Sequence, residues 1–254
     1  MEVDLNCDLG ESFGRYRIGA DEAMMQYITS ANIACGYHAG DPLVMDRAVR
    51  LAAKHGVGIG AHPGFPDLMG FGRRAMQLSS EEIENYILYQ IGALAAFARA
   101  AGVELVHVKP HGALYNMAAK DAELARAIVH GIARFSRELI AVCPAGSAMI
   151  GAAEEAGLRV AREGFADRAY SPDGTLRSRQ LSGALIEDPC VAAERAIKMV
   201  RDGIVVTHSG EEIPLRVETI CVHGDSPGAV QIAQAIRKEL GAAGIEVVPM
   251  GSFV

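Results

Sequence analysis

Five short apolar runs in this chain each end in a histidine or an aspartate that stands close to glycine. They are VDLNCDLGES (3–12), ANIACGYHAGD (31–41), VGIGAHPGFPD (57–67), LVHVKPHGALYN (105–116) and ICVHGDSPG (220–228). A short apolar run of this kind predicts a buried parallel strand, with the polar residues at its carboxyl end. The carboxyl ends of parallel strands meet on one rim, where open α/β sheets and (β/α) barrels hold their active sites. The pattern therefore indicates an enzyme.

Helical segments separate these runs. Ser79 and Glu82 have the spacing of a capping box at the start of a helix that ends at Gly102. Three other helices are expected after a cap residue followed by proline, at Asp41-Pro42, Asp188-Pro189 and Ser226-Pro227. Strands are expected near 3–7, 31–36, 57–61, 105–109, 139–143, 158–162 and 219–222, with a late strand at 245–249. Roughly seven or eight βα units in this length favour a closed barrel, and residues 204–217 are typical of an inserted β-hairpin.

Composition limits the class of protein. With 254 residues, 50% of them hydrophobic, the chain can bury one large core, so we expect a single barrel domain over 1–254. The net charge of −7 argues against nucleic acid or an anionic membrane surface as a partner. No apolar stretch reaches the roughly 18 residues of a membrane span. Five scattered cysteines without a Cys-x-x-Cys pair predict buried thiols in a reducing cytoplasm.

The rim carries the residue types needed for acid–base chemistry. The catalytic candidates, which we expect to converge on one cavity, are Asp8, Glu11, His38, His62, Lys109, His111, His223 and Asp225. Strand alternation places Lys109 on the same side as His111, where its ammonium group could meet a phosphate or an oxyanion. The alternative is a rim lysine that points into solvent. As rim residues, Lys109 and Asp8 are expected to contribute little to stability, on the order of ±0.5 kcal/mol on substitution.

Two long loops, 63–74 and 163–185, are expected to border the same rim. Their arginines suit a carboxylate or phosphate ligand, because a guanidinium group binds such oxygens bidentately. Surface salt bridges are the alternative for each arginine. The binding candidates from these loops and the adjoining strands are Asn6, Arg73, Arg74, Tyr115, Asn116, Glu163, Asp167 and Arg168.

The sequence alone does not decide whether the chain binds a metal ion. Asp8, His38 and His62 follow consecutive strands, and one carboxylate with two imidazoles is an acceptable set for zinc or another divalent ion. No HExxH motif supports that set, and no GxxxxGK[ST] phosphate-binding loop occurs in the chain. A nucleotide would therefore bind at an unconventional site or on a partner protein.

Six segments together resemble one family. DLNCDLGESFG, NIACGYHAGDP, GAHPGFPDLMGFGRR, VKPHGALYN, EGFADRAY and ICVHGDSPGAV are similar to the signature segments of the LamB/YcsF family, the A subunits of bacterial ATP-dependent 5-oxoprolinase. The resemblance implies a distorted seven-stranded (β/α) TIM-like barrel of the glycoside hydrolase and deacetylase type. It also implies that 5-oxo-L-proline, ATP and water give L-glutamate, ADP and phosphate, and that partner subunits B and C are required.

The chemistry implied by this resemblance needs a base for water, cations for phosphate oxygens and donors for an oxyanion. ATP is the expected cofactor, with a divalent ion such as Mg²⁺ either bound to ATP or held in the site. Two other functions stay open: an independent metal-dependent hydrolase or deacetylase of sugars or amides, and a non-catalytic substrate-binding subunit. The isolated chain is expected to be folded but nearly inactive, and the sequence is compatible with a homo-oligomer.

Overall fold

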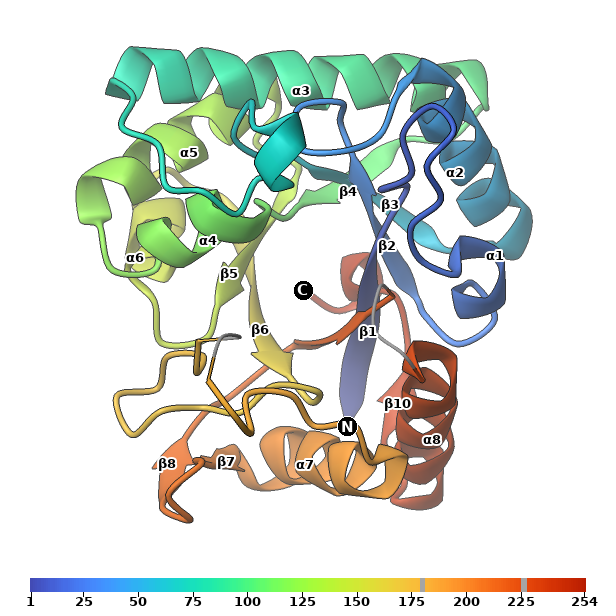
Figure 1. Ribbon diagram of the computed structural model, residues 1–254, viewed down its shortest axis with the longest axis vertical. Coiled ribbons are helices and arrows are strands. Elements are labelled where there is room, and N and C mark those ends of the chain that lie inside the picture. The colour runs from blue at the N-terminus through green and yellow to red at the C-terminus, as the bar shows by residue number, and fades with distance from the viewer. Residues whose placement is uncertain (179–180, 225–227) are drawn as a thin grey trace.

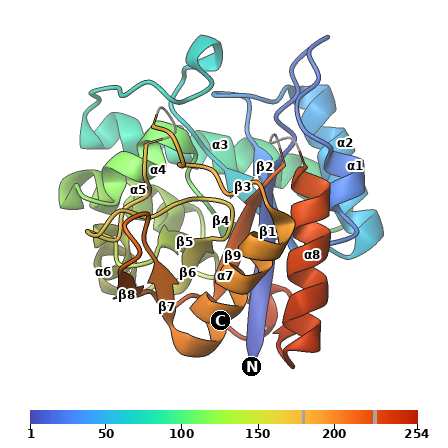
Figure 2. The same cartoon turned by 60° about the horizontal axis from the view of Figure 1, so that its bottom comes forward.

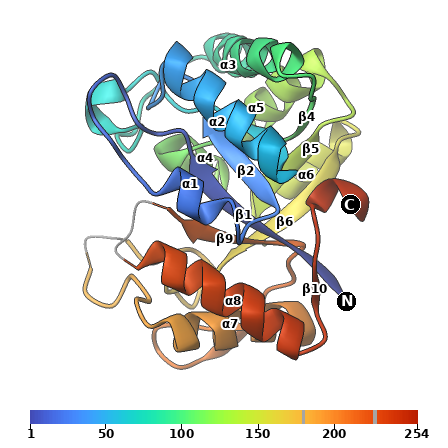
Figure 3. The same cartoon turned by 90° about the vertical axis from the view of Figure 1, so that its right-hand side faces the viewer.

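A ring of parallel strands forms the centre of the computed structural model, which describes residues 1–178, 181–224 and 228–254, and helices surround this ring (Figures 1 and 3). The ring strands are β1 (Glu2–Leu9), β2 (Ser30–Ala34), β3 (Gly58–His62), β4 (Leu105–Val108), β5 (Ile140–Pro144), β6 (Arg159–Phe165) and β9 (Thr219–His223). Each pairs with the next, and β9 pairs with β1 to close the ring. The expected seven-stranded α/β barrel is thus confirmed, and the late strand β10 (Glu246–Val247) lies beside the start of β1.

Helices surround the barrel strands (Figure 1). They are α1 (Asp21–Met24), α2 (Pro42–His55), α3 (Ser80–Ala100), α4 (Gly112–Ala118), α5 (Ala122–Phe135), α6 (Ala148–Glu155), α7 (Pro189–Asp202) and α8 (Ala229–Ala242), with 3₁₀ turns η1 (Leu68–Gly70) and η2 (Met250–Ser252). Asp41 and Asp188 accept hydrogen bonds from the first turns of α2 and α7, and the capping box of Ser79 and Glu82 is formed. The expected cap at Ser226-Pro227 lies outside the described residues.

The inserted hairpin is also confirmed. Strands β7 (Ile204–Val206) and β8 (Glu212–Pro214) pair antiparallel and form a sheet separate from the barrel. Figure 2 shows the hairpin beside α7, and it shows both chain termini at the end of the barrel opposite the long loop that contains η1. No helix in the described part of the chain is long and apolar enough to cross a membrane.

The barrel is distorted between β3 and β4. The pairing register shifts between Ile59 and Gly60, and β4 pairs with β5 through only two residues. The buried ring of His107 lies against Gly60 at this point: a Cβ atom on Gly60 would lie 2.1 Å from the His107 Nε2 atom. Only glycine leaves room for an imidazole inside the barrel at this position.

Polar side chains from β1 occupy part of the barrel interior, beside a small apolar cluster of Ile140, Val142, Ala161 and Met250. In β1, Leu5 and Cys7 belong to the apolar core between strands and helices, whereas Asp4 and Asn6 bond to side chains of neighbouring strands. Asp4 accepts hydrogen bonds from hydroxyl groups of β2 and β9 and from Thr29, yet burial raises its pKa to about 6. The same alternation directs Asn6 and Asp8 inward, toward the carboxyl end of the barrel.

Candidate active site

A cavity of about 780 Å³ opens at the carboxyl end of the barrel strands. The residues proposed from the sequence that line it are Asp8, Glu11, His62, Lys109, His111, His223, Arg73, Tyr115, Asn116, Glu163 and Arg168. They lie on β1, β3, β6 and β9, directly after β1 and β4, on α4 and in the two long loops. Six of the eight catalytic candidates thus line this cavity, where side chains at the carboxyl ends of parallel strands are expected to meet.

The other proposed residues lie elsewhere. Asn6 is fully buried below the cavity, and His38 is buried behind its wall. Asp167 is buried against His223, to which it is hydrogen-bonded. Arg74 points away and pairs with Asp67, so it holds the 63–74 loop instead of lining the cavity. Asp225 lies outside the described residues.

Lys109 is at the centre of a buried ion cluster. Its Nζ atom lies 2.9 Å from Asp8 Oδ1 and 2.9 Å from Glu163 Oε1, and only 2% of its side chain is exposed. Lys109 was expected to be an exposed rim residue, and its burial contradicts that expectation, because Asp8 of β1 and Glu163 of β6 project into the barrel beside it. Glu163 is also not a loop residue, since β6 continues to Phe165.

The interactions within this cluster keep Lys109 protonated and Asp8 ionised. Burial alone would lower the pKa of Lys109, but Asp8, Cys221 and Glu163 raise it well above its usual range. Burial would raise the pKa of Asp8, yet His62 and Lys109 hold it well below its usual range. Asp8 is therefore an ionised carboxylate at the cavity wall, and Lys109 is its cationic partner.

Amide and hydroxyl groups complete this cluster. Asn32 Nδ2 donates to Asn6 Oδ1 at 2.7 Å and to Asp8 Oδ1 at 2.8 Å. Tyr115 donates from its hydroxyl group to Glu163 Oε2 at 2.8 Å. Asn32 was not among the residues proposed from the sequence, and neither was Cys221, whose Sγ atom lies 3.1 Å from Lys109 Nζ. Both sit at inward positions of predicted strands, and that alternation was the signal that could have identified them.

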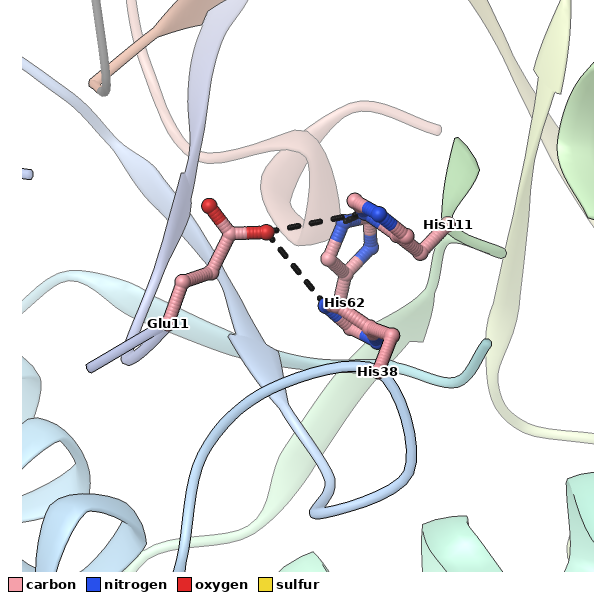
Figure 4. Close-up of side chains that lie close together, drawn as sticks. All are labelled: Glu11, His38, His62 and His111. Carbon is pink, nitrogen blue, oxygen red and sulfur yellow. Dashed lines mark hydrogen bonds and ion pairs between the residues drawn. The ribbon is translucent and has the colours of Figure 1, made fainter. Parts of the chain in front are cut away.

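A second cluster consists of Glu11, His38, His62 and His111 (Figure 4). Glu11 Oε1 lies 3.3 Å from His38 Nε2 and 3.5 Å from His111 Nδ1. His62 Nε2 lies 2.9 Å from His111 Nδ1, and the rings of His38 and His111 stack with centroids 3.7 Å apart. Burial lowers the pKa of His38 well below its usual range and that of His111 to about 3.

This second cluster differs from the ligand set expected from the sequence. His38 and His62 are together, as expected, but the nearest carboxylate to His38 is that of Glu11, and His111 joins them. The Asp8 carboxylate contacts this cluster at His62, where Oδ2 lies 3.4 Å from Nε2. Asp8 also belongs to a separate group of potential ligands with Cys221 and His223.

His223 and Asp167 form a hydrogen-bonded pair at the cavity, and a potential ligand atom of His223 lies within 4.8 Å of one of Asp8. His223 Nδ1 lies 2.8 Å from Asp167 Oδ2, which also accepts the backbone N–H of His223 at 3.1 Å. Burial would raise the pKa of Asp167, but His223 and its hydrogen bonds hold it low. In a neutral imidazole ring, this contact places the proton on Nδ1, next to the carboxylate, and the lone pair on Nε2.

Comparison with known proteins agrees with the fold and the sequence segments. The chain is 61% identical to the A subunit of 5-oxoprolinase from Pyrococcus furiosus, and the alignment covers all of both chains. The crystal structure of a lactam utilization protein from Thermus thermophilus matches with a TM-score of 0.93 at 49% identity, over 98% of this chain and 99% of that one. A family 4 carbohydrate esterase from Streptomyces lividans matches with a TM-score of 0.50 at 12% identity, over 97% and 91% of the two chains, and shares the fold alone.

The family assignment rests on nearly the whole sequence. The match begins in β1 and extends through β10 to the last residue, so it includes every strand whose end contributes to the cavity. The pattern of the LamB/YcsF family matches residues 3–254, and the chain therefore belongs to that family.

Proposed function

We propose that this chain is the A subunit of an ATP-dependent 5-oxoprolinase, which opens 5-oxo-L-proline to L-glutamate. The observation that carries the proposal is the full-length similarity to relatives that are named as the A subunit of 5-oxoprolinase. The cavity supports it, because it combines acid–base side chains with arginines that suit the carboxylate of such a substrate. We expect the protein to act in the cytoplasm.

The reaction explains why ATP is needed. A five-membered lactam is an unstrained amide, so its ring opening must be coupled to ATP hydrolysis. Transfer of the γ-phosphoryl group to the lactam oxygen releases ADP and activates the ring carbon. Water adds to that carbon, the carbon–nitrogen bond breaks, and the nitrogen takes a proton. A second water then releases phosphate from the resulting acyl phosphate and leaves L-glutamate.

His223 is the proposed base for the attacking water. Asp167 holds the imidazole proton on Nδ1, so Nε2 can accept the proton that water loses. Lys109 and Asp8 have a positioning role in this proposal, because each satisfies the other's charge at the cavity wall. Arg73 and Arg168 line the cavity and are the proposed anchors for the substrate carboxylate.

ATP binding is proposed to need the partner subunits B and C. The chain has no GxxxxGK[ST] loop, whereas its cavity is rich in acid–base groups. The test measures glutamate and phosphate release by this chain alone and with subunits B and C, with and without ATP. Turnover only in the complete mixture with ATP is expected.

A matched pair of histidine variants links the reaction to this cavity. His223→Gln should lower kcat of the complex by at least about a hundredfold, as is typical for loss of a general base. His130→Gln is the control, because its side chain is 57% exposed on α5, away from the cavity. Full activity of the single chain with ATP would overturn the partner requirement, and full activity of His223→Gln would overturn the role of the base.

A second candidate function is supported by the cluster of Glu11 and three histidines. Such a cluster is typical of hydrolases that use a metal-bound water without a nucleotide. That function predicts hydrolysis of an amide or acetylated sugar by the single chain without ATP, so the same set of mixtures separates the two functions.

A further inference from the structure

The proton positions in the second cluster can be worked out from its backbone contacts. His62 Nδ1 lies 2.6 Å from the carbonyl oxygen of Lys109. A carbonyl oxygen only accepts hydrogen bonds, so Nδ1 must carry a proton. In the neutral ring, the lone pair of His62 is therefore on Nε2.

The same reasoning applies to His111 on the other side of the cluster. Its Nε2 atom lies 2.9 Å from the carbonyl oxygen of Phe71, so Nε2 carries the proton and Nδ1 the lone pair. The two nitrogens that face one another, His62 Nε2 and His111 Nδ1, are 2.9 Å apart and are both acceptors. Two acceptors at this distance repel one another unless a cation or an additional proton lies between or beside them.

The surrounding atoms add further acceptors. Glu11 Oε1 is 3.5 Å from His111 Nδ1, and Asp8 Oδ2 is 3.4 Å from His62 Nε2. His38 points Nε2 toward Glu11, while its buried Nδ1 atom has no hydrogen-bond partner among the described residues. Neither nitrogen of His38 is committed to a carbonyl oxygen, so Nε2 can present a lone pair as well.

We propose that Glu11, His38, His62 and His111 bind one divalent transition-metal ion of the zinc class. Metal-binding histidines typically donate their second N–H to a carbonyl or carboxylate oxygen, as His62 and His111 do here. Three imidazoles and one carboxylate suit zinc and exclude calcium and magnesium, which prefer oxygen ligands.

The spacing of the four ligand atoms fits such an ion. Zinc–ligand bonds of about 2.0–2.1 Å in a tetrahedron place the ligand atoms roughly 3.4 Å apart. The distance from His111 Nδ1 is 2.9 Å to His62 Nε2 and 3.5 Å to Glu11 Oε1. One potential ligand atom from each of the four residues lies within 4.8 Å of the others. Gly72 allows this arrangement, since a Cβ atom there would lie 2.7 Å from His38 Cβ and 2.8 Å from His111 Cδ2.

The proposal competes with one other explanation, in which His62 is doubly protonated and donates from Nε2 to His111 or Asp8. Metal binding does not depend on the proposed lactam chemistry. Its measurement uses the purified full-length chain without substrate or partner subunits, so a failure of one proposal leaves the other intact.

The experiment is equilibrium dialysis of the full-length chain against buffered Zn²⁺, followed by elemental analysis. We expect one zinc per chain, and replacement by Co²⁺ should give the intense visible absorption of a four-coordinate site. Glu11→Gln, His38→Gln and His62→Gln should each weaken binding by at least about tenfold. His130→Gln should bind as the wild type does, since it changes an exposed histidine outside the cluster.

Circular dichroism of each variant separates loss of a ligand from loss of the fold. If one histidine variant unfolds, Glu11→Gln still tests the site, because it keeps the size of the side chain and removes only its charge. The proposal is overturned if the folded wild-type chain takes up less than stoichiometric zinc, or if binding is the same in the ligand variants and in His130→Gln. The proposal is also overturned if ¹⁵N NMR of the zinc-treated chain shows that both ring nitrogens of His62 are protonated.

Discussion

Replacement of Lys109 by methionine should strongly destabilise the fold. Methionine has about the same length, so the main change is loss of the charge that neutralises Asp8 and Glu163, each 2.9 Å from Nζ. Removing one partner from a buried ion pair costs about 3–5 kcal/mol, because the remaining charge is left without compensation. For a chain of this size each kcal/mol corresponds to about 2–4 °C in Tm, so we expect a fall of roughly 10 °C.

The control is Lys120→Met. Lys120 also pairs with an aspartate, Asp173, but its side chain is 65% exposed. An exposed pair contributes little, so this variant should stay within about ±0.5 kcal/mol of the wild type. The assay is thermal and urea unfolding of the three proteins, monitored by circular dichroism.

The pH dependence gives a second check of the same reasoning. In the wild type the pKa of Lys109 is raised, so its contribution is complete at neutral pH and is lost only as pH rises through that higher value. The pKa of Asp8 is lowered, so its contribution is lost only at acid pH. In Lys109→Met the uncompensated carboxylates should take up protons, and the stability difference from wild type should shrink as the pH is lowered from neutral toward the usual carboxyl range, about pH 4. Equal melting temperatures for the two lysine variants, or a difference that does not change with pH, would refute the buried ion cluster.

Three other predictions follow from separate parts of the structure. Burial raises the pKa of Asp4 to about 6, so stability should fall by roughly 3 kcal/mol as pH rises from about 4 to 6, and Asp4→Asn should remove that slope in urea unfolding curves. Arg73→Lys should raise KM for 5-oxoproline about tenfold, whereas Arg74→Lys should leave it unchanged because Arg74 pairs with Asp67; equal effects in steady-state kinetics would contradict this. Asp167→Asn should lower kcat of the complex by about a hundredfold or more with little change in KM, since the uncharged amide would no longer hold the proton of His223 on Nδ1.

The fold was predictable because local signals agreed with one another. Each barrel strand appears in the sequence as a short apolar run, and the caps at Ser79, Asp41 and Asp188 mark the starts of their helices. Parallel strands share one carboxyl end, so the runs that end in Asp8 and His223 had to meet there. Two strands were longer than predicted, which places Asp8 within β1 and Glu163 within β6.

The charge state of the interior was not predictable from these runs. Lys109 follows a four-residue strand and was expected at the rim, but its partners Asp8 and Glu163 lie 101 and 54 positions away in the chain. A strand pattern identifies which residues point inward without showing which ones meet across the barrel. Lys109 can be buried because its ammonium group contacts two carboxylates across the barrel, each at 2.9 Å, which compensate its charge.

The sequence predicted Asp8 as the carboxylate of the histidine cluster, whereas the structure has Glu11 there, and this difference also has a physical reason. Strand alternation determines the direction of Asp8, but β1 ends at Leu9 and Gly10 then turns the chain with a φ of +68°. Beyond such a glycine the alternation no longer predicts where a side chain points. The turn brings Glu11 Oε1 to 3.3 Å from His38 Nε2, whereas Asp8 remains bonded to Lys109. The two carboxylates thus serve two neighbouring clusters, one that holds the ammonium group and one that we propose holds a metal ion.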